Sequence, residues 1–286
     1  MSETITIQIR ATDFEVDRAI NAYISILESS YQLAKGMPYN LPDGYQEIGR
    51  VSTSPGSVGR MARAEEAPEA RPEARAMAAA TVHPDLFGFI VREVATGAVI
   101  ISIRGTLVPE EWLRNFTAIP ADYSFLPHFG TVHLGFRLVY AGVRASLEQG
   151  LAAVPGNTRI TVLGHSLGGA MATLAGPDIK RNLNQENVDV CTFGGPRVGK
   201  PDFRVKFNAE IARCHRVTNQ FDIVPHVPTI VTGWMHVGEE VEVDGNLENA
   251  HSLVAYLAGL RAIGAADPGL TSRSLDRRGL MSAVVP

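Results

Sequence analysis

Gly164, Ser166 and Gly168, spaced as G-x-S-x-G, are the residues of this sequence whose types and spacing most directly suggest chemistry. An apolar, β-branched run over 159–163 precedes them, and a helix-compatible run over 167–175 follows. A strand, a sharp turn and a helix form a nucleophile elbow, which lifts one serine hydroxyl off the end of a sheet. Small neighbours are needed because the serine is strained and other backbone packs close to it. We therefore predict that Ser166 is a nucleophile, although the motif alone also arises by chance in glycine-rich chains.

A serine nucleophile needs a base, and the base needs an acid that holds its tautomer. In elbow enzymes the chain order is serine, acid, histidine. Asp222 follows an expected strand at 215–219 and lies among apolar residues and prolines, so we expect a partly buried carboxylate with a hydrogen-bonded partner. The alternative is an aspartate that only caps a turn. Asp202 and Asp244 have the surroundings of a helix start and of a hairpin turn.

The base must be chosen among eight histidines. His251 is the last of them and lies at an expected loop-to-helix junction, from which a side chain can reach the end of a sheet, so we predict it as the base. His226 is the next candidate, although it follows Asp222 closely. His165 lies inside the elbow, and its side chain should point away from Ser166. Four others precede the serine, neighbour a proline or fall within expected strands, namely His83, His128, His215 and His236.

Two backbone or hydroxyl donors are expected to stabilise the negative oxygen of a tetrahedral intermediate. One is the N–H of Leu167, directly after the nucleophile, and the other should come from a loop that follows an earlier strand. The segment 103–106 provides such a loop, and Thr106 could donate both its N–H and its hydroxyl. The alternative is that Thr106 belongs to an ordinary Gly-Thr strand exit.

The elements expected to hold these residues alternate between strands and helices. This alternation predicts an α/β fold with a mostly parallel central sheet flanked by helices, and ligands on such sheets bind at the carboxyl ends of the strands. The expected helices are 14–33 (with Asp13 as a possible N-cap), 133–153, 201–211 and 251–263; the expected strands are 86–94, 98–104, 159–165, 188–193 and 215–219, with an antiparallel pair at 235–243.

Composition excludes several other classes of protein. The 286 residues can bury a substantial core, and the net charge of −4 gives no reason to expect nucleic acid as a partner. No stretch approaches about 18 consecutive apolar residues, so no transmembrane segment is expected. Cys191 and Cys214, the only cysteines, fall in expected strands and are interpreted as buried free thiols.

Three segments are expected to lie outside the core. Residues 52–80 are rich in Pro, Gly, Glu, Ala and Arg, and Pro68 and Pro72 prevent one continuous helix, so we expect a mobile insertion. Residues 264–286 are expected to form a C-terminal tail. The start of the sequence has neither a basic region nor an apolar run, so no Sec-type signal peptide is expected there; cytoplasmic and secreted locations both stay open.

Taken together, these motifs resemble those of the class 3 (filamentous-fungal-type) lipases of the α/β-hydrolase fold, over about residues 84–262. The resemblance implies a single α/β-hydrolase domain over 1–286, with Ser166, Asp222 and His251 as the triad and Thr106 and Leu167 as the oxyanion hole. The matching pieces, in the family's order, are 103–106, 111–115, 132–136, 164–169, 192–199, 222–225 and 251–256.

The resemblance also implies a lid over residues 107–118. Its apolar side chains would cover the acyl site in water; they are Leu107, Val108, Trp112, Leu113 and Phe116. The alternative is a surface helix that is packed permanently on the core.

The function implied is that of a serine carboxylic-ester hydrolase, a lipase that cleaves acylglycerol esters and contacts a lipid interface transiently. No metal or organic cofactor is implied. Two rivals would use the same site, an esterase of soluble or aryl (feruloyl-type) esters and a phospholipase. A non-catalytic lipid-binding protein built on a hydrolase fold is a rival from another class.

Overall fold

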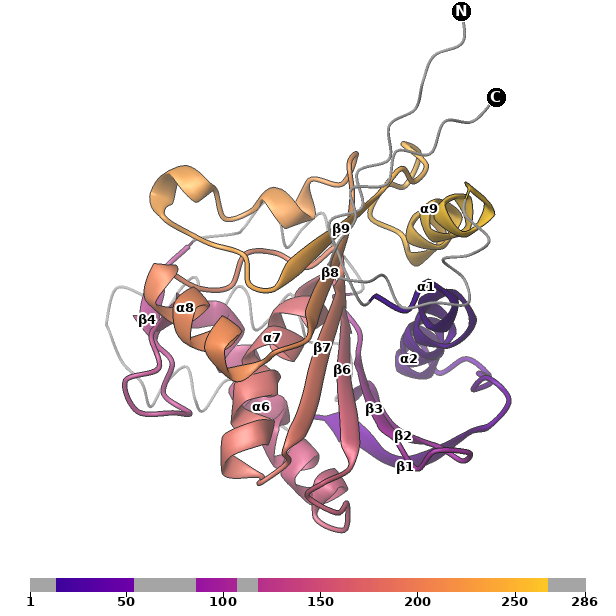
Figure 1. The fold of residues 1–286 in the computed structure, drawn as a ribbon, viewed down its shortest axis with the longest axis horizontal. Coiled ribbons are helices and arrows are strands. Elements are labelled where there is room, and N and C mark those ends of the chain that lie inside the picture. Colours follow the sequence, from indigo (N-terminus) through magenta and orange to yellow (C-terminus); the bar gives the residue numbers. More distant parts are fainter. Residues whose placement is uncertain (1–13, 54–85, 107–117, 267–286) are drawn as a thin grey trace, which may run out of the picture.

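A seven-stranded sheet forms the centre of the computed structural model, which describes residues 14–53, 86–106 and 118–266 (Figure 1). The strand order is β1-β2-β3-β6-β7-β8-β9. The strands β1 to β3 are antiparallel, and β3, β6, β7, β8 and β9 run parallel, so the expected α/β fold is confirmed. The bounds are β1 (Tyr45–Ser52), β2 (Leu86–Glu93), β3 (Val99–Ile103), β6 (Arg159–His165), β7 (Asn187–Phe193), β8 (Cys214–Asn219) and β9 (Glu239–Val243).

Helices cover both faces of the sheet (Figure 1). One face carries α6 (Leu134–Leu151), α7 (Leu167–Asn182) and α8 (Pro201–Glu210); the other carries α1 (Val16–Arg18), the π-helical turn η1 (Ala19–Tyr23), α2 (Ile24–Ala34) and α9 (Leu253–Ala266). Successive side chains of a strand point to opposite faces. In β6, therefore, Ile160 and Val162 join the core beneath α6 and α7, whereas Leu163 joins the core beneath α2 and α9. Alternate residues of the same strands therefore contribute to the two cores.

The expected antiparallel pair at 235–243 is wrong. Only β9 forms there, and it pairs parallel with β8, while Met235 makes an isolated bridge to Gly199. A strand parallel to its predecessor needs a long crossover. The loop 220–238 supplies it, with the 3₁₀ turns η2 (Val224–His226) and η3 (Ile230–Thr232). His236 consequently lies in this loop rather than within a strand, and Asp244 follows β9 rather than closing a hairpin.

Other boundaries also differ from the expectations. The strand β1 was not predicted, and Ser52, expected to open the insertion, is its last residue; the Ser52 N–H donates to Ser146 Oγ at 3.0 Å. The helix α9 runs to Ala266, so the tail begins later than residue 264. A small second sheet joins β4 (Pro120–Asp122) and β5 (Thr131–His133). Asp13, residues 54–80 of the expected insertion and residues 107–117 of the expected lid lie outside the described residues.

Two further expectations concern single residues and membrane spans. Cys191 and Cys214 are both buried and free, as expected. Burial raises the pKa of the Cys214 thiol to about 12 and that of Cys191 well above its ordinary value, so both stay protonated near neutral pH. Within the described ranges, no helix is long and apolar enough to cross a bilayer.

Candidate active site

Ser166 occupies the sharp turn between β6 and α7. Its φ of 58° and ψ of −127° lie in a region that side-chain-bearing residues rarely adopt, at a cost of about 1–3 kcal/mol. Hydrogen bonds hold the turn: the Ser166 N–H donates to Phe193 O at 3.0 Å, and the Gly169 N–H donates to Ser166 O at 2.8 Å. The strained serine of the predicted elbow is therefore present, at the carboxyl end of a central strand.

The two flanking glycines are required by close backbone contacts. A Cβ on Gly164 would lie 2.1 Å from the Gly168 carbonyl oxygen, and a Cβ on Gly168 would lie 2.0 Å from Ile103 O. Real Cβ atoms do not approach backbone so closely, and backbone cannot move aside as a flexible side chain can. The G-x-S-x-G spacing thus lets α7 begin directly against β6 and β3.

Asp222 and His251 form a hydrogen-bonded pair. The His251 Nδ1–H donates to Asp222 Oδ2 at 2.7 Å, and the Tyr256 hydroxyl donates to the same oxygen at 2.6 Å. The other oxygen, Oδ1, accepts the Val224 N–H at 2.9 Å, so the carboxylate also caps a turn. Because an ionised carboxylate only accepts, the proton of a neutral His251 ring lies on Nδ1 and leaves Nε2 as the acceptor.

Two buried polar atoms at this place lack a partner. Ser166 Oγ and His251 Nε2 have no hydrogen bond to any of the described residues. Both residues border Gly194, at the end of β7: Ser166 binds Phe193 O, and a Cβ on Gly194 would lie 3.2 Å from His251 Cε1 and 2.8 Å from Asp222 Oδ2. Unpartnered buried polar atoms are uncommon and require an explanation. Here the two atoms are those that proton transfer from a serine to a histidine would use.

The loop after β3 lies against the serine. A Cβ on Gly105 would be 2.6 Å from Ser166 Cβ, and the next residue, Thr106, is buried. Leu167 is the first residue of α7, so its N–H has no partner within the helix and lies at the positive end of the helix dipole. The two donors expected from the sequence thus come from segments that border Ser166 on either side.

A buried network behind the serine joins three segments of the site. The Tyr31 hydroxyl, on α2, accepts the Gly105 N–H at 2.9 Å and contacts His165 Nδ1 at 2.7 Å. The other ring nitrogen of His165 contacts the carbonyl oxygen of His251 at 2.8 Å. A carbonyl can only accept, so His165 Nε2 carries the proton, Nδ1 is an acceptor, and Tyr31 donates to it.

His165 stays neutral within this network. Burial, and secondarily the nearby His251 ring, hold the pKa of His165 well below its ordinary value. Burial also disfavours the charged form of Tyr31 and therefore raises the pKa of its hydroxyl. The hydrogen-bond directions in this network are therefore fixed near neutral pH. Tyr31 thus connects α2 to the loop before Thr106 and, through His165, to the segment that carries His251.

Comparison with known proteins relates part of the chain to one family. Residues 100–232 match the family model described as lipase (class 3). This segment, just under half of the chain, is similar to the class 3 lipases. The chain is 32% identical over 170 residues to a lipase of Rhizomucor miehei, covering 57% of this chain and 46% of that protein. It is 35% identical over 202 residues to phospholipase A1-II 4 of Oryza sativa subsp. japonica, covering 57% and 50% respectively.

Solved structures of lipases have the same fold. The lipase of Rhizopus microsporus var. chinensis superposes with a TM-score of 0.63 at 22% identity, over 86% of this chain and 85% of that one. At this identity the likeness shows the α/β-hydrolase fold alone. The chain spans about half the length of the matched relatives from Rhizomucor and Oryza.

The structure brings together most of the residues that the sequence predicts for the active site. Ser166, Asp222, His251, Thr106 and Leu167 all lie at the carboxyl end of the parallel strands. The alternative base His226 is exposed in the turn η2. The five lid side chains lie outside the described residues.

Three supporting side chains were missed. Strand alternation places His165 with Leu163 on the α2 face, a signal that could have been used. Tyr256 follows His251 by five residues, so a hydrogen bond from its hydroxyl to the carboxylate that holds His251 could also have been foreseen. No signal connects Tyr31 to His165, because 134 residues separate them.

Proposed function

We propose that this protein is a serine hydrolase of carboxylic esters and that its substrates are acylglycerols. One observation carries the proposal. Ser166 Oγ, on a strained elbow, and Nε2 of an Asp222-bound His251 are two buried polar atoms without partners among the described residues, and both lie at the carboxyl end of the sheet. The similarity of residues 100–232 to the class 3 lipases supports the same chemistry.

In this mechanism, His251 Nε2 takes the proton of Ser166 Oγ as the oxygen attacks the ester carbonyl. The negative oxygen of the tetrahedral intermediate is stabilised by donors from Thr106 and Leu167. His251 then passes the proton to the departing alcohol, and an acyl-serine remains. Water, deprotonated by His251, hydrolyses that ester and restores the serine. Asp222 orients the imidazole and stabilises the charged form that His251 adopts when it takes the proton.

A phospholipase is the second candidate. The observation that favours it is the relationship to phospholipase A1-II 4 of rice, whose identity to this chain, 35%, is slightly above that of the fungal lipase. Both reactions use the same acyl chemistry and differ in the group that leaves. The choice between them depends on the substrate-contacting surface rather than on the triad.

Three substrates tested side by side distinguish these functions. We expect the purified chain to hydrolyse p-nitrophenyl esters and emulsified triacylglycerol, and to release fatty acid from phosphatidylcholine vesicles more slowly. Faster hydrolysis of the phospholipid would favour the phospholipase. Turnover of short, soluble esters alone would favour a soluble esterase. Failure of a fluorophosphonate to label Ser166 would favour the non-catalytic lipid-binding protein.

Replacing Thr106 with valine should lower kcat by about 10²–10³, because one oxyanion donor is lost while the volume and the backbone N–H are kept. KM should change much less, since the donor acts mainly in the transition state. The measurement is steady-state hydrolysis of a soluble p-nitrophenyl ester. Thr106→Ser, which keeps the hydroxyl, is the matched control and should retain most of the activity. Equal kcat in the wild type and Thr106→Val would show that the Thr106 hydroxyl does not stabilise the oxyanion.

Replacing Tyr31 with phenylalanine should lower both stability and kcat. The Gly105 N–H and His165 Nδ1 would lose their partner in a buried place, which costs about 1–3 kcal/mol of unfolding free energy. The loop before Thr106 would also shift, and small displacements of catalytic groups cost roughly 10- to 100-fold in rate. The measurements are urea unfolding and kcat.

Tyr123→Phe separates the two effects of the Tyr31 substitution. Its hydroxyl is also buried and donates to Leu174 O at 2.6 Å, but in the core beneath α6 and α7. This variant should lose comparable stability and keep its kcat. If Tyr123→Phe and Tyr31→Phe lowered kcat equally, the effect of Tyr31 would be general destabilisation and not the positioning of the site.

A further inference from the structure

A cavity of about 680 Å³ lies at the end of the sheet opposite Ser166. It is bordered by α1, by the turn between β2 and β3 and by the connection between α6 and β6. Arg159 is the first residue of β6, and Ser166 follows its last. Seven strand residues span about 20 Å, so this cavity is separate from the candidate active site. Its side chains include Arg18, Arg92, Glu93, Thr96, Ala98 and Arg159.

The charge of the cavity wall is positive. Three arginines and one carboxylate, Glu93, are the ionisable side chains that line it. Glu93 is already occupied, since it accepts hydrogen bonds from Arg18 Nη2 at 2.9 Å, from the Tyr45 hydroxyl at 3.0 Å and from Thr96. Thr96 Oγ1 in turn accepts the Ala98 N–H, which fixes the turn. The wall thus carries two positive charges in excess, although the whole chain carries a net charge of −4.

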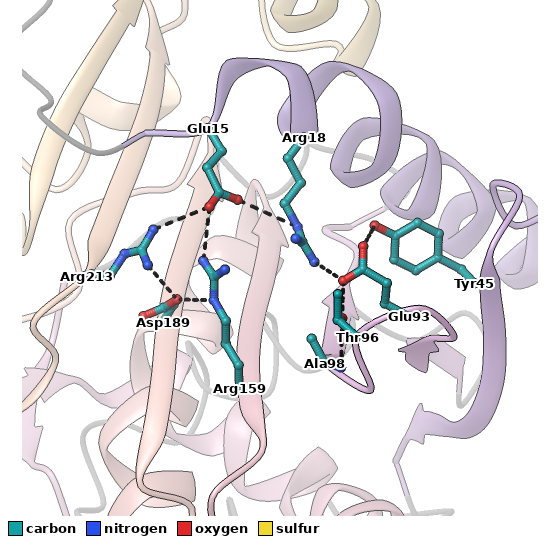
Figure 2. Close-up of polar contacts among 9 residues, drawn as sticks. All are labelled: Glu15, Arg18, Tyr45, Glu93, Thr96, Ala98, Arg159, Asp189 and Arg213. Carbon is teal, nitrogen blue, oxygen red and sulfur yellow. Dashed lines mark hydrogen bonds and ion pairs between the residues drawn. The ribbon is translucent and has the colours of Figure 1, made fainter. Parts of the chain in front are cut away.

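A second group of charges lies behind Arg159 (Figure 2). Arg159 Nε donates to Asp189 Oδ2 at 3.1 Å, and its Nη2 lies 3.5 Å from Glu15 Oε1. Arg213 shares both carboxylates, at 3.7 and 3.9 Å. Arg159 and Arg213 therefore pair with the same two carboxylates. The cavity lining and this second group together contain four arginines and three carboxylates, so one positive charge is in excess.

Two of the arginines that line the cavity keep donors that these contacts do not use. Figure 2 shows one terminal nitrogen of Arg159 without an interaction, on the side of Glu93 and Thr96. The guanidinium group of Arg92, near the end of β2, makes no hydrogen bond or ion pair with any of the residues described. Arg18 and Arg159 have a structural role, because their ion pairs with Glu93 and Glu15 connect α1 to the sheet. That role does not explain Arg92, whose fork of donors binds none of the side chains in the described part of the chain.

We propose that this cavity binds a phosphate dianion, as inorganic phosphate or as the phosphate of a small monoester, at the guanidinium group of Arg92. The guanidinium fork matches two phosphate oxygens at once, and charge-assisted hydrogen bonds of this kind are about twice as strong as neutral ones. Inorganic phosphate would fill only a small part of 680 Å³. The remaining wall includes Ala98, Ala153 and Pro155, which fit an apolar group attached to the phosphate.

Isothermal titration of the full chain tests the proposal, with inorganic phosphate and phenyl phosphate as probes at constant ionic strength set with chloride. We expect saturable binding of one phosphate per chain. Tighter binding of phenyl phosphate would identify a monoester as the ligand, and equal binding would identify free phosphate. The absence of saturable binding of either probe up to about 10 mM, ten times a millimolar dissociation constant, would overturn the proposal.

Three variants decide whether the binding belongs to this cavity. Arg92→Gln should weaken it by roughly tenfold or more, because a charge-assisted contact is lost. Arg92→Lys, which keeps the charge but not the fork, should fall between Arg92→Gln and the wild type. Arg181→Gln removes the same charge from α7, where Arg181 is exposed, and should bind as the wild type does. Equal weakening in Arg92→Gln and Arg181→Gln would show general charge attraction and overturn the site.

The enzymatic activity of these variants is measured alongside. Arg92→Gln should hydrolyse a soluble p-nitrophenyl ester as the wild type does, which also reports that it is folded. Ser166→Ala should bind the phosphate probes with unchanged affinity. Loss of phosphate binding in Ser166→Ala would place the ligand at the serine instead and contradict the proposal.

Discussion

Replacing Ser166 with alanine should lower kcat for ester hydrolysis by about 10⁵–10⁶. Without Oγ no acyl-enzyme can form, and the rate that remains comes from binding and from the oxyanion donors. Stability should not fall, because the deleted hydroxyl is buried and has no hydrogen bond within the described part of the chain. The measurements are hydrolysis of a p-nitrophenyl ester and the thermal midpoint of the purified variant.

Ser102→Ala is the matched control for this result. Ser102 is also buried, on β3, but its hydroxyl lies 2.8 Å from Ser30 Oγ, so its removal breaks a hydrogen bond. It should lower stability by about 1 kcal/mol and leave kcat nearly unchanged. The two serines are therefore expected to show opposite patterns. Near-wild-type hydrolysis by pure Ser166→Ala would overturn the proposed mechanism altogether.

Replacing Asp222 with asparagine should lower kcat by about 10⁴, with little change in KM. The carboxylate accepts three hydrogen bonds, from His251 Nδ1, from Tyr256 and from the Val224 N–H. An amide must present its NH₂ to at least one of these donors. If it faces His251, the ring proton moves to Nε2, which is then unable to accept the serine proton. The measurement is kcat and KM for a soluble ester.

Tyr256→Phe removes only one of these three bonds and keeps the carboxylate. Burial, followed by the charge of Asp222, raises the pKa of the Tyr256 hydroxyl well above its ordinary value, so it donates at every relevant pH. Its loss should reduce kcat far less than Asp222→Asn does. Wild-type kcat in Asp222→Asn, or inactivity of His226→Ala together with an active His251→Ala, would show that the base and its acid were assigned wrongly.

The candidate site could be predicted from the sequence where its chemistry depends on local spacing. The glycines around Ser166 mark the elbow, and chain order selects Asp222 and His251 after it. The positioning network could not be predicted in the same way. Tyr31 reaches His165 because the alternation of β6 turns that side chain toward α2, and nothing near Tyr31 in the sequence records this contact.

Hydrophobic patterning determined the α/β class of this protein, its central strands and helices, and the turn that exposes a serine, because strand and helix periods are local properties. The tertiary structure decided which distant segments pair. It placed β9 parallel to β8, added β1 at the edge, and brought arginines of α1, β2 and β6 around one cavity. Such pairings depend on which surfaces meet when the sheet and helices pack, and the spacing of residues along the chain does not encode them directly.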